Sequence, residues 1–464
     1  MTRCFRTFLT KYTTNSIPPQ PFEIIPTPRG LPIVGTTLSL IAAGSASKLH
    51  IYIDKRHKQL GNIFKDKIGP INAVFTSDPS VMRSVFAQEG KYPTHVLPDA
   101  WRLYNDLHGC SRGLFFMDGE EWLHFRRIMN GLLLKGDLSY IERGCEIACE
   151  ELVDTILFNC NPLMEDLEGT LYRWSLNVLT AILMGAEDYS RSKAELDEQL
   201  KHLASTVKLV FSTSVSLQIL PAGFAAKYKL GVWKNFEEAV DNALRASSCL
   251  VEELLNRQPG KSGLLYKMLE QNIKRSDVTR IVTDLVIAAG DTSAYTMQWM
   301  LYLMSKHKEL QKEIRENRDS NFSRNVIKET LRLYPVAPFI TRFIPEDCII
   351  ANYKIPKSTL VILSLYTCGR DPKFFEEPNT FLPKRWQRDY REKLNTVQQA
   401  SIPFAIGARS CVGRKIAECQ LQLALEKILR KFEIELKNTE EVEMVLKMVG
   451  VPSRKILIEF REIC

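Results

Sequence analysis

The residues best suited to chemistry surround Cys411, which lies in the glycine-bounded stretch from Phe404 to Gly413. A thiolate in such a loop can be an axial ligand of haem iron, where it pushes electron density onto the metal and favours O–O cleavage. Gly407 and Gly413 let the backbone turn sharply close to a flat ring. Backbone N–H groups at the start of the next helix, expected from Arg414 to about Phe432, can stabilise the sulfur's charge. Arg409 can reach a haem propionate.

The alternative is that Cys411 is a buried structural cysteine, which is the usual state of a free cysteine. The sequence contains eleven cysteines, without the spacing of a disulfide framework or a zinc site. Cys145 and Cys149 are four residues apart and are interpreted as core packing on one helical face. This cysteine usage is typical of a reducing compartment.

A second constellation, Ala288-Ala289-Gly290-Asp291-Thr292-Ser293, interrupts a long helical pattern from Asp277 to about His307. Glycine weakens a helix, and Thr292 can bond to a carbonyl one turn back. The functional interpretation is a notch with room for dioxygen, in which Thr292 holds the oxygen and Asp291 relays protons inward. The alternative is a simple helix kink with a satisfied polar pair.

The pattern Phe-x-x-Gly-x-Arg-x-Cys-x-Gly over Phe404 to Gly413 resembles the signature of the cytochrome P450 monooxygenases at every fixed position. The resemblance extends over residues 22–464. It implies a single mostly α-helical fold with a small β-sheet region and a buried haem b, whose iron is ligated by the Cys411 thiolate. The family's oxygen-activating motif is matched by Asp291 and Thr292, with Ala289 as a mild departure.

The resemblance also assigns residues that hold the haem and its loop. Trp122 and Arg126, four apart on a helix expected from Glu120 to about Leu134, match a Trp-x-x-x-Arg pair that holds a propionate. Without the resemblance, this pair is an ordinary surface helix contact. Phe404 and Arg409 belong to the haem loop. Arg342 is a second expected propionate partner.

A structural triad is expected from Glu329, Arg332 and Arg385. Glu329 and Arg332 match the family's Glu-x-x-Arg on a helix, and a buried pair of this kind needs further partners. The segment around Arg385 departs from the family's usual Pro-Glu-Arg-Phe, because Lys384 replaces the acid and Trp386 the phenylalanine. Arg385 itself is kept, so the triad is expected to lock the loop that carries Cys411. The alternative is a solvated helix pair.

Length and composition frame these assignments. The chain has 464 residues, with 45% hydrophobic and 25% charged residues, as in a globular enzyme with a large core. Strands are expected over 68–76 around a Gly-Pro turn, helices over 47–59 and 79–89, and an exposed linker over 258–262. Residues 137–255 are expected to be largely helical, with breaks at Pro162, Gly185 and 221–223.

The N-terminal composition predicts a mitochondrial location, and the net charge predicts an acidic partner. Residues 1–22 contain Arg, Lys, Ser and Thr but no acid, which is typical of a mitochondrial transit peptide and leaves 23–464 as the monooxygenase domain. The alternative is a disordered tail. The net charge of +8 suits an acidic protein or an anionic membrane, and no nucleic-acid recognition motif is found.

The basic residues Arg324, Lys328, Arg414 and Lys415 match places where mitochondrial members dock a ferredoxin, which receives electrons from an NADPH-dependent reductase. Outside that context they are a solvated face. The stretch Pro221 to Trp233 combines aromatic and basic residues and is predicted to contact a membrane surface peripherally, on the matrix side of the inner membrane. An ordinary packed helix and loop is the alternative.

Substrate specificity is implied by closer resemblance to insect mitochondrial ecdysteroid 2-hydroxylases, which implies hydroxylation of a 2-deoxyecdysteroid at carbon 2. Ecdysteroid hydroxylation at carbon 20 or 22, a detoxifying monooxygenase and a non-catalytic haem sensor are the alternatives. The resemblance rests on five stretches: Arg29–Gly35, Pro98–Asn105, Arg112–Met117, Asp284–Asp291 and Leu333–Phe339.

Overall fold

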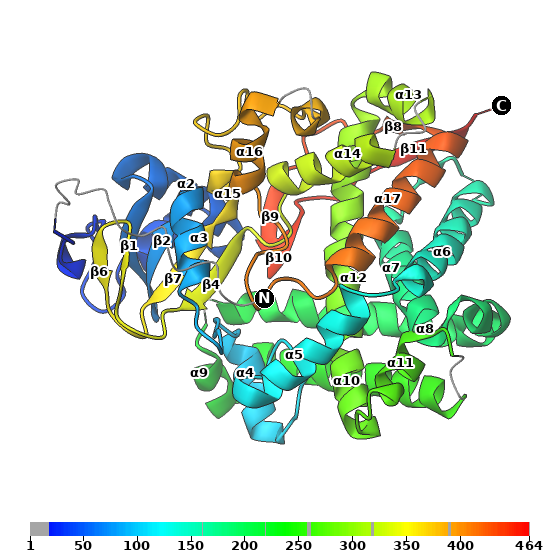
Figure 1. Cartoon of the computed structure of the whole chain (residues 1–464), viewed down its shortest axis with the longest axis horizontal. Coiled ribbons are helices and arrows are strands. Elements are labelled where there is room, and N and C mark those ends of the chain that lie inside the picture. Colours follow the sequence, from blue (N-terminus) through cyan, green and yellow to red (C-terminus); the bar gives the residue numbers. More distant parts are fainter. Residues whose placement is uncertain are drawn as a thin grey trace, which may run out of the picture.

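The computed structural model describes residues 18–159, 161–218, 220–257, 261–316, 320–387 and 391–463. Most of the expected transit segment 1–22, and most of the expected linker 258–262, therefore lie outside the described residues. A large helical part and a smaller part built around a β-sheet lie side by side (Figure 1). The predicted single, mostly helical fold with a small β region is confirmed.

The helical part is organised around α12 (Arg275–Ser305), which crosses the middle of the molecule (Figure 1). From Ala294 onward every side chain of α12 is buried, and Trp299 stacks on Tyr334 with ring centroids 4.0 Å apart. Burial of each such aromatic side chain stabilises the fold by about 1.5–3 kcal/mol. The helices that pack on or near α12 are α5 (Gly119–Leu133), α6 (Ser139–Leu157), α7 (Leu167–Met184), α8 (Ala186–Ser214), α10 (Gly231–Asn256), α11 (Leu264–Glu270), α13 (Lys308–Glu316), α14 (Ser320–Leu333) and α17 (Arg414–Lys431).

The smaller part contains a four-stranded sheet with the order β1-β2-β7-β4. β1 (Ile63–Ile68) and β2 (Ile71–Thr76) form an antiparallel hairpin, β2 pairs with β7 (Leu360–Ser364) in parallel, and β4 (Phe339–Phe343) is antiparallel to β7. The helices of this part are α1 (Thr37–Ala42), α2 (Leu49–Leu60), α3 (Pro79–Ala87), α15 (Leu365–Cys368) and α16 (Arg391–Ala400). Two further helices, α4 (Asp99–His108) and α9 (Ala222–Lys227), pack on each other, and their buried side chains belong to the core of the helical part.

Three small sheets complete the described fold. A three-stranded sheet has the order β3-β11-β8, and two hairpins pair β5 with β6 and β9 with β10. Their strands are β3 (Leu163–Met164), β5 (Cys348–Ile350), β6 (Tyr353–Ile355), β8 (Phe432–Leu436), β9 (Met444–Lys447), β10 (Val449–Pro452) and β11 (Ile458–Glu462).

Local sequence signals explain several element boundaries. Asp78 caps α3 by accepting hydrogen bonds from the backbone N–H groups of Ser80 and Val81. Gly185, with φ of +95°, ends α7 and starts α8 at one of the predicted breaks. The predicted turn at Gly69 is confirmed, but β1 begins at Ile63, five residues before the predicted start. The charged run Lys65 to Lys67 hid this strand, although Asp66 is buried and accepts a hydrogen bond from Thr36.

The predicted interruption of α12 is wrong in one respect, because the helix continues unbroken from Arg275 to Ser305. Any space for dioxygen at this point must therefore come from the small side chains and not from a lost helical turn. Ala288 and Thr292, one turn apart, are exposed on a helix whose other central residues are largely buried.

The predicted packing role of Cys145 and Cys149 on α6 is confirmed, since both thiols are fully buried.

Candidate functional site

The loop that carries Cys411 runs beside α12 and leads into α17 (orange in Figure 1). The backbone N–H of Cys411 donates to the carbonyl of Phe404, 2.9 Å away, which closes the loop. Gly407 has φ of +82°, and a Cβ atom there would lie 2.2 Å from Oε1 of Glu89. A side chain at Gly407 is therefore excluded both by backbone conformation and by space.

Cys411 is exposed on the surface of the loop. The helix that follows the loop, α17, is anchored to α12 further along, where the buried Gln420 donates to the hydroxyl of Ser293 at 2.6 Å. The surrounding protein desolvates the thiol and raises its pKa, while the Gly413 N–H and the charges of Arg126 and Arg414 act in the opposite direction. A coordinated metal ion deprotonates such a thiol. The predicted N–H group directed at the sulfur is thus present at Gly413.

Four basic side chains from four segments gather near this loop: Arg126 of α5, Arg342 of β4, Arg409 of the loop and His95. Arg126 donates to the carbonyl of Ser410 at 2.5 Å. Burial lowers the pKa of Arg409 to about 10, with Arg342 and Arg126 adding to the decrease and Asp118 opposing it. Burial, followed by the charges of Arg409 and Arg342, lowers the pKa of His95 to about 3, so its ring is neutral.

Three nitrogen atoms of this cluster are buried without a hydrogen-bond partner, namely Nε of Arg126, one terminal nitrogen of Arg342 and Nε2 of His95. The two guanidinium nitrogens are donors that need acceptors, because an unpaired buried polar group costs about 1–3 kcal/mol, whereas Nε2 of the neutral His95 ring is a donor in only one of its tautomers. Carboxylates are the matching partners for guanidinium groups. The cluster and the exposed Cys411 therefore fit an iron porphyrin that carries propionates.

Arg409 already has several protein partners. It donates to the carbonyl of Met117 at 2.6 Å and to Asp118 at 2.5 Å, and also to the carbonyl of Pro93. Its guanidinium lies 4.4 Å from the centroid of Trp122, which is itself buried. In this structure Arg409 ties the loop to residues 93–118 and to Trp122 of α5, and the unpaired guanidinium donors belong to Arg126 and Arg342.

Sequence reasoning missed Glu89 and His95. Glu89 is buried and bridges two predicted site segments, because it accepts from Nε of Arg342 at 2.7 Å and from the backbone N–H of Ala408 at 2.6 Å. His95 packs on Phe115 with centroids 4.7 Å apart. Neither residue lies in a recognisable motif, and only the fold brings them to the loop.

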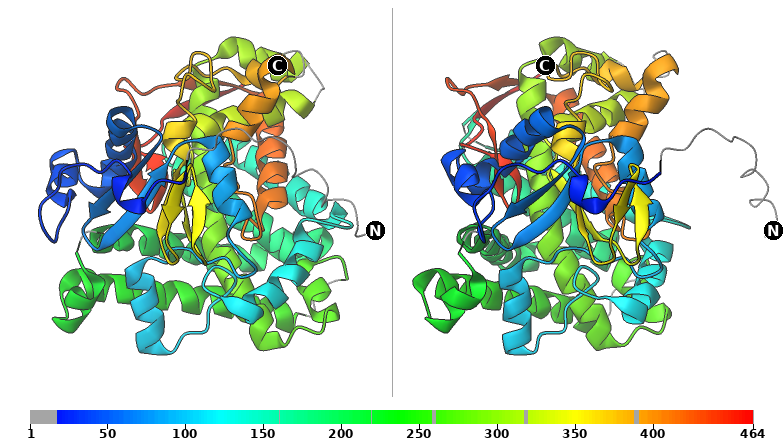
Figure 2. Two further views of the ribbon diagram at one scale, coloured as in Figure 1. Left: turned by 60° about the vertical axis from the view of Figure 1, so that its left-hand side comes forward. Right: turned by 90° about the vertical axis from the view of Figure 1, so that its left-hand side faces the viewer.

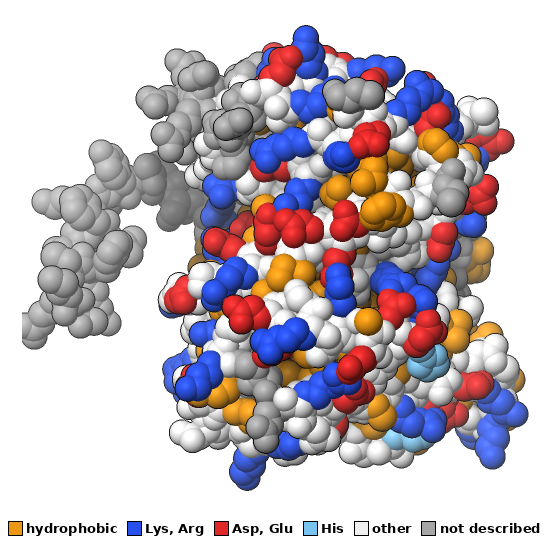
Figure 3. All heavy atoms as spheres, turned by 90° about the vertical axis from the view of Figure 1, so that its right-hand side faces the viewer, with side chains coloured by type: hydrophobic (Ala, Val, Ile, Leu, Met, Phe, Trp, Pro, Cys, Tyr) orange, Lys and Arg blue, Asp and Glu red, His pale blue; other side chains and the backbone are white. Residues whose placement is uncertain are grey.

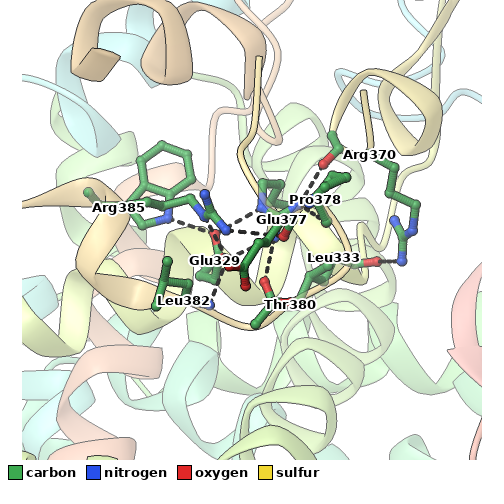
Figure 4. A network of polar contacts seen from close by, with 11 residues as sticks. Glu329, Leu333, Arg370, Glu377, Pro378, Thr380, Leu382 and Arg385 are labelled. Atoms are coloured by element: carbon green, nitrogen blue, oxygen red, sulfur yellow. Dashed lines mark hydrogen bonds and ion pairs between the residues drawn. The ribbon is translucent and has the colours of Figure 1, made fainter. Parts of the chain in front are cut away.

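The residues Glu329, Arg332 and Arg385 meet in a buried network (Figure 4). Glu329 accepts from Arg332 at 2.8 and 2.9 Å and from Nε of Arg385 at 2.9 Å. Arg332 also donates to the carbonyls of Gly369, Pro378 and Thr380. Burial favours the neutral acid, but the hydrogen bonds and charges of Arg332 and Arg385 outweigh it and lower the pKa of Glu329.

Trp386, one of the two departures from the family pattern, is part of the same network. Its ring N–H donates to Glu329 at 2.9 Å, and the backbone N–H of Leu382 donates to the other carboxylate oxygen at 2.9 Å. The 3-10 turn that contains Trp386, Pro383–Trp386, packs directly on α14. A tryptophan here therefore adds a donor that a phenylalanine lacks.

Asp291 and Thr292 point in different directions from α12. Thr292 is exposed and donates to the carbonyl of Ala288 at 3.1 Å, as predicted for a residue that bonds one turn back. Asp291 is 1% exposed and accepts a hydrogen bond from Tyr172 of α7. The pKa of Asp291 is raised to about 7, and burial is the largest cause. The charge of Glu168 acts in the same direction as burial, while the hydrogen bond from Tyr172 and the charge of Lys208 oppose it.

The basic residues Arg324, Lys328, Arg414 and Lys415 occupy two helices in contact, α14 and α17. Arg324 donates to Gln422 of α17 at 3.0 Å, and Lys328 lies 5.8 Å from the ring centroid of Trp386. Burial and then Arg324 lower the pKa of Lys328, whereas Glu418 raises it. The structure thus brings the four predicted cations to one region, with Glu418 among them.

Comparison with known proteins extends these observations to the whole chain. The family model described as Cytochrome P450 matches residues 25–460. "Cytochrome P450 315a1, mitochondrial" from Drosophila melanogaster is 41% identical over 99% of this chain and 93% of that protein. The rat "1,25-dihydroxyvitamin D(3) 24-hydroxylase, mitochondrial" is 26% identical over 94% and 88%, and the rainbow trout "Cholesterol side-chain cleavage enzyme, mitochondrial" is 26% identical over 89% and 85%.

Replacement of the loop cysteine tests the ligand assignment. We expect Cys411→Ser to bind haem weakly or not at all and to lose the thiolate-type carbon monoxide spectrum, because a serine hydroxyl is a poor anionic ligand. The measurement is the reduced carbon monoxide difference spectrum. Cys249→Ser, at an exposed position on α10, is the control. An unchanged spectrum for Cys411→Ser would show that another residue ligates the iron.

The Trp386 hydrogen bond is tested by Trp386→Phe. Hydrogen bonds to charged groups contribute about 1.5–3 kcal/mol, so the free energy of unfolding should fall by about 2 kcal/mol beyond the loss of ring area. Trp299→Phe is the control for ring area, because its N–H meets only a neutral carbonyl at 3.5 Å. Urea unfolding of both variants gives the difference.

The pH dependence of that difference has a defined sign. The folded-state pKa of Glu329 is depressed, so its contribution to stability is present above the unfolded-state pKa and is lost as the pH falls through the folded-state pKa. The deficit of Trp386→Phe relative to Trp299→Phe should therefore be full at pH 7 and shrink in acid. A deficit that is equal at all pH values would contradict a bond to the ionised carboxylate.

Proposed function

The chain belongs to the cytochrome P450 family and is a monooxygenase with a cysteine-ligated haem, and from this premise we propose that it hydroxylates 2-deoxyecdysone at carbon 2 to give ecdysone. The single observation that carries this proposal is the 41% identity to the Drosophila mitochondrial protein over nearly the whole chain. The five stretches that resemble the insect ecdysteroid 2-hydroxylase Shadow support it, since several of them lie in regions expected to face the substrate.

The site residues of this chain are proposed to act as follows. Cys411 would ligate the haem iron, and the haem would supply the activation of dioxygen. Arg126 and Arg342 offer their unpaired donors to the propionates, with Arg409, Trp122 and Phe404 holding the loop in place.

The reaction takes one dioxygen molecule, two electrons and two protons, places one oxygen atom in the substrate and releases the other as water. Asp291, with its pKa raised to about 7 by burial, is suited to accept and release protons at neutral pH. Thr292 presents its hydroxyl on the exposed side of α12.

We propose that electrons come from a mitochondrial ferredoxin with its NADPH-dependent reductase. Arg324, Lys328, Arg414 and Lys415 form a basic region next to the loop of Cys411, and such a region steers an acidic partner. Acidic and basic side chains alternate over the face in Figure 3, so the net charge of +8 is not one continuous basic field. Docking of an acidic protein therefore depends on the local arrangement of these four cations.

The proposed location is mitochondrial, with peripheral contact at the inner membrane. Residues 1–22 are proposed as the transit peptide. None of the described helices has the length and apolarity needed to cross a bilayer.

In the predicted membrane-contacting stretch, Phe224 and Tyr228 are more than half exposed, whereas Trp233 is buried, so the prediction that Trp233 contributes is wrong. Ile33 and Leu38 near the N-terminus are also exposed. The blue N-terminal segment that contains α1 and the green segment around α9 lie towards the same left-hand side in both views of Figure 2.

The proposal is tested by turnover of 2-deoxyecdysone by the purified protein with a mitochondrial ferredoxin, its reductase and NADPH. We expect a product with one added oxygen atom at carbon 2, identified by mass and by the position of the hydroxyl group. Hydroxylation of an ecdysteroid at carbon 20 or 22 would assign a sister activity. Weak oxidation of many unrelated apolar compounds would indicate a detoxifying enzyme.

Docking is tested by Lys328→Glu. We expect the KM for ferredoxin to rise by about tenfold, which corresponds to roughly 1.4 kcal/mol. Turnover driven by hydrogen peroxide, which needs no ferredoxin, should stay unchanged. Lys234→Glu, an exposed lysine on α10, is the matched control. Equal losses in the two assays would contradict a docking role.

A further inference from the structure

The buried face of α12 opposite the exposed Thr292 contains an arrangement that no sequence motif indicated. Two tyrosine–carboxylate pairs join α12 to α7. Tyr172 of α7 donates to Asp291 of α12, and Tyr295 of α12 donates to Glu168 of α7 at 3.1 Å. In each helix the two members are four residues apart, so both lie on the face turned to the other helix.

We propose that Tyr172 is a positioning residue for proton delivery, which holds the carboxyl group of Asp291 and connects it to the surface through the Glu168–Tyr295 pair and Lys208. This inference rests on the monooxygenase reaction, which consumes two protons per turnover, and is independent of which steroid is the substrate. Because Asp291 is 1% exposed, each proton that it delivers must be replaced through neighbouring polar groups.

The packing of Tyr172 is specific to this position. A Cβ atom at Gly290 would lie 2.6 Å from the Tyr172 ring, so only glycine leaves room for the tyrosine beside Asp291. Ser175, three residues further along α7, donates to the carbonyl of Ala289 at 2.8 Å. The small residues of the notch therefore have a second role, because they seat α7 against the carboxyl group.

The connection to solvent runs through α8. Lys208 of α8 is half-exposed and contacts Glu168 at 2.7 Å, and Glu168 is itself partly exposed. Tyr172, Glu168, Tyr295 and Lys208 are the titratable groups that face Asp291 from α7, α12 and α8. Direct contacts join Lys208 to Glu168 and Glu168 to Tyr295, and a separate hydrogen bond joins Tyr172 to Asp291; the two groups lie one helical turn apart on α7 and α12.

The protonation states agree with this role. Burial raises the pKa of Asp291 to about 7, so both of its forms are populated at neutral pH. Burial, with the charge and hydrogen bond of Asp291, raises the pKa of Tyr172 well above its usual value. Tyr172 therefore stays protonated and acts as a fixed donor, which keeps the carboxyl group in one orientation while the proton on Asp291 is exchanged.

The test is Tyr172→Phe, which keeps the ring against Gly290 and removes only the hydroxyl. General acid–base groups contribute about 10²–10⁴-fold to rate; for a residue that acts through Asp291 we expect about a tenfold loss of ferredoxin-driven turnover. The solvent deuterium isotope effect should increase, and more NADPH should be consumed per product. Turnover with hydrogen peroxide should stay within about twofold of the wild type, because the peroxide itself brings both electrons and both protons of this step.

The matched control is Tyr189→Phe, which removes a hydroxyl that donates to Glu151 at 2.8 Å from an equally buried ring. It should leave both assays and the isotope effect unchanged. Glu168→Gln should reproduce the isotope effect of Tyr172→Phe in weaker form. Equal losses with ferredoxin and peroxide, or an unchanged isotope effect in Tyr172→Phe, would overturn the proposal. The substrate is whichever steroid the wild type hydroxylates, so a failure on 2-deoxyecdysone alone would affect only the substrate proposal.

Discussion

The buried carboxylate of Glu329 is the charge on which the packing of α14 against residues 369–386 depends. An ion taken out of water costs several kcal/mol unless it is fully paired. Here Arg332, Arg385 and Trp386 donate to it together with a backbone N–H. These donors come from α14 and from the segment before the cysteine loop, so the charge can be buried only when both are in place.

A second electrostatic constraint acts on the other side of that loop. Arg126, Arg342 and Arg409 lie close enough for each of the other two to lower the pKa of Arg409. Glu89 compensates one of these charges within the interior and at the same time bonds to the loop. Positive charges that lie close together, with some of their N–H donors unpaired, are stabilised when an anionic group binds between them. The propionates of a bound haem would supply such groups, and haem binding would then be linked to the position of Cys411.

The central helix α12 is packed differently on its two sides. One side presents Thr292 and Ala288 as exposed residues, and the opposite side buries Asp291 against α7. The same short run of residues therefore leaves side chains exposed on one side and accepts Tyr172 against Gly290 on the other. A glycine that weakens the helix in isolation is tolerated because the neighbouring helices enclose it.

The sequence by itself determined the fold class, the Cys411 loop, the helix with Asp291 and Thr292, and the Glu329–Arg332 pair, because these depend on short spacings along one segment. Tertiary structure alone decided that Glu89, His95 and Tyr172 join the site, and that Trp386 completes the network of Glu329. Each of these contacts joins residues distant in sequence, and no periodicity or motif encodes such a pairing. The orientation of Asp291 towards Tyr172, like the burial of Trp233 in a stretch predicted to be exposed, was decided by which faces of neighbouring helices pack together. That choice minimises unpaired buried charge and exposed apolar area over the whole chain, which no single segment can do.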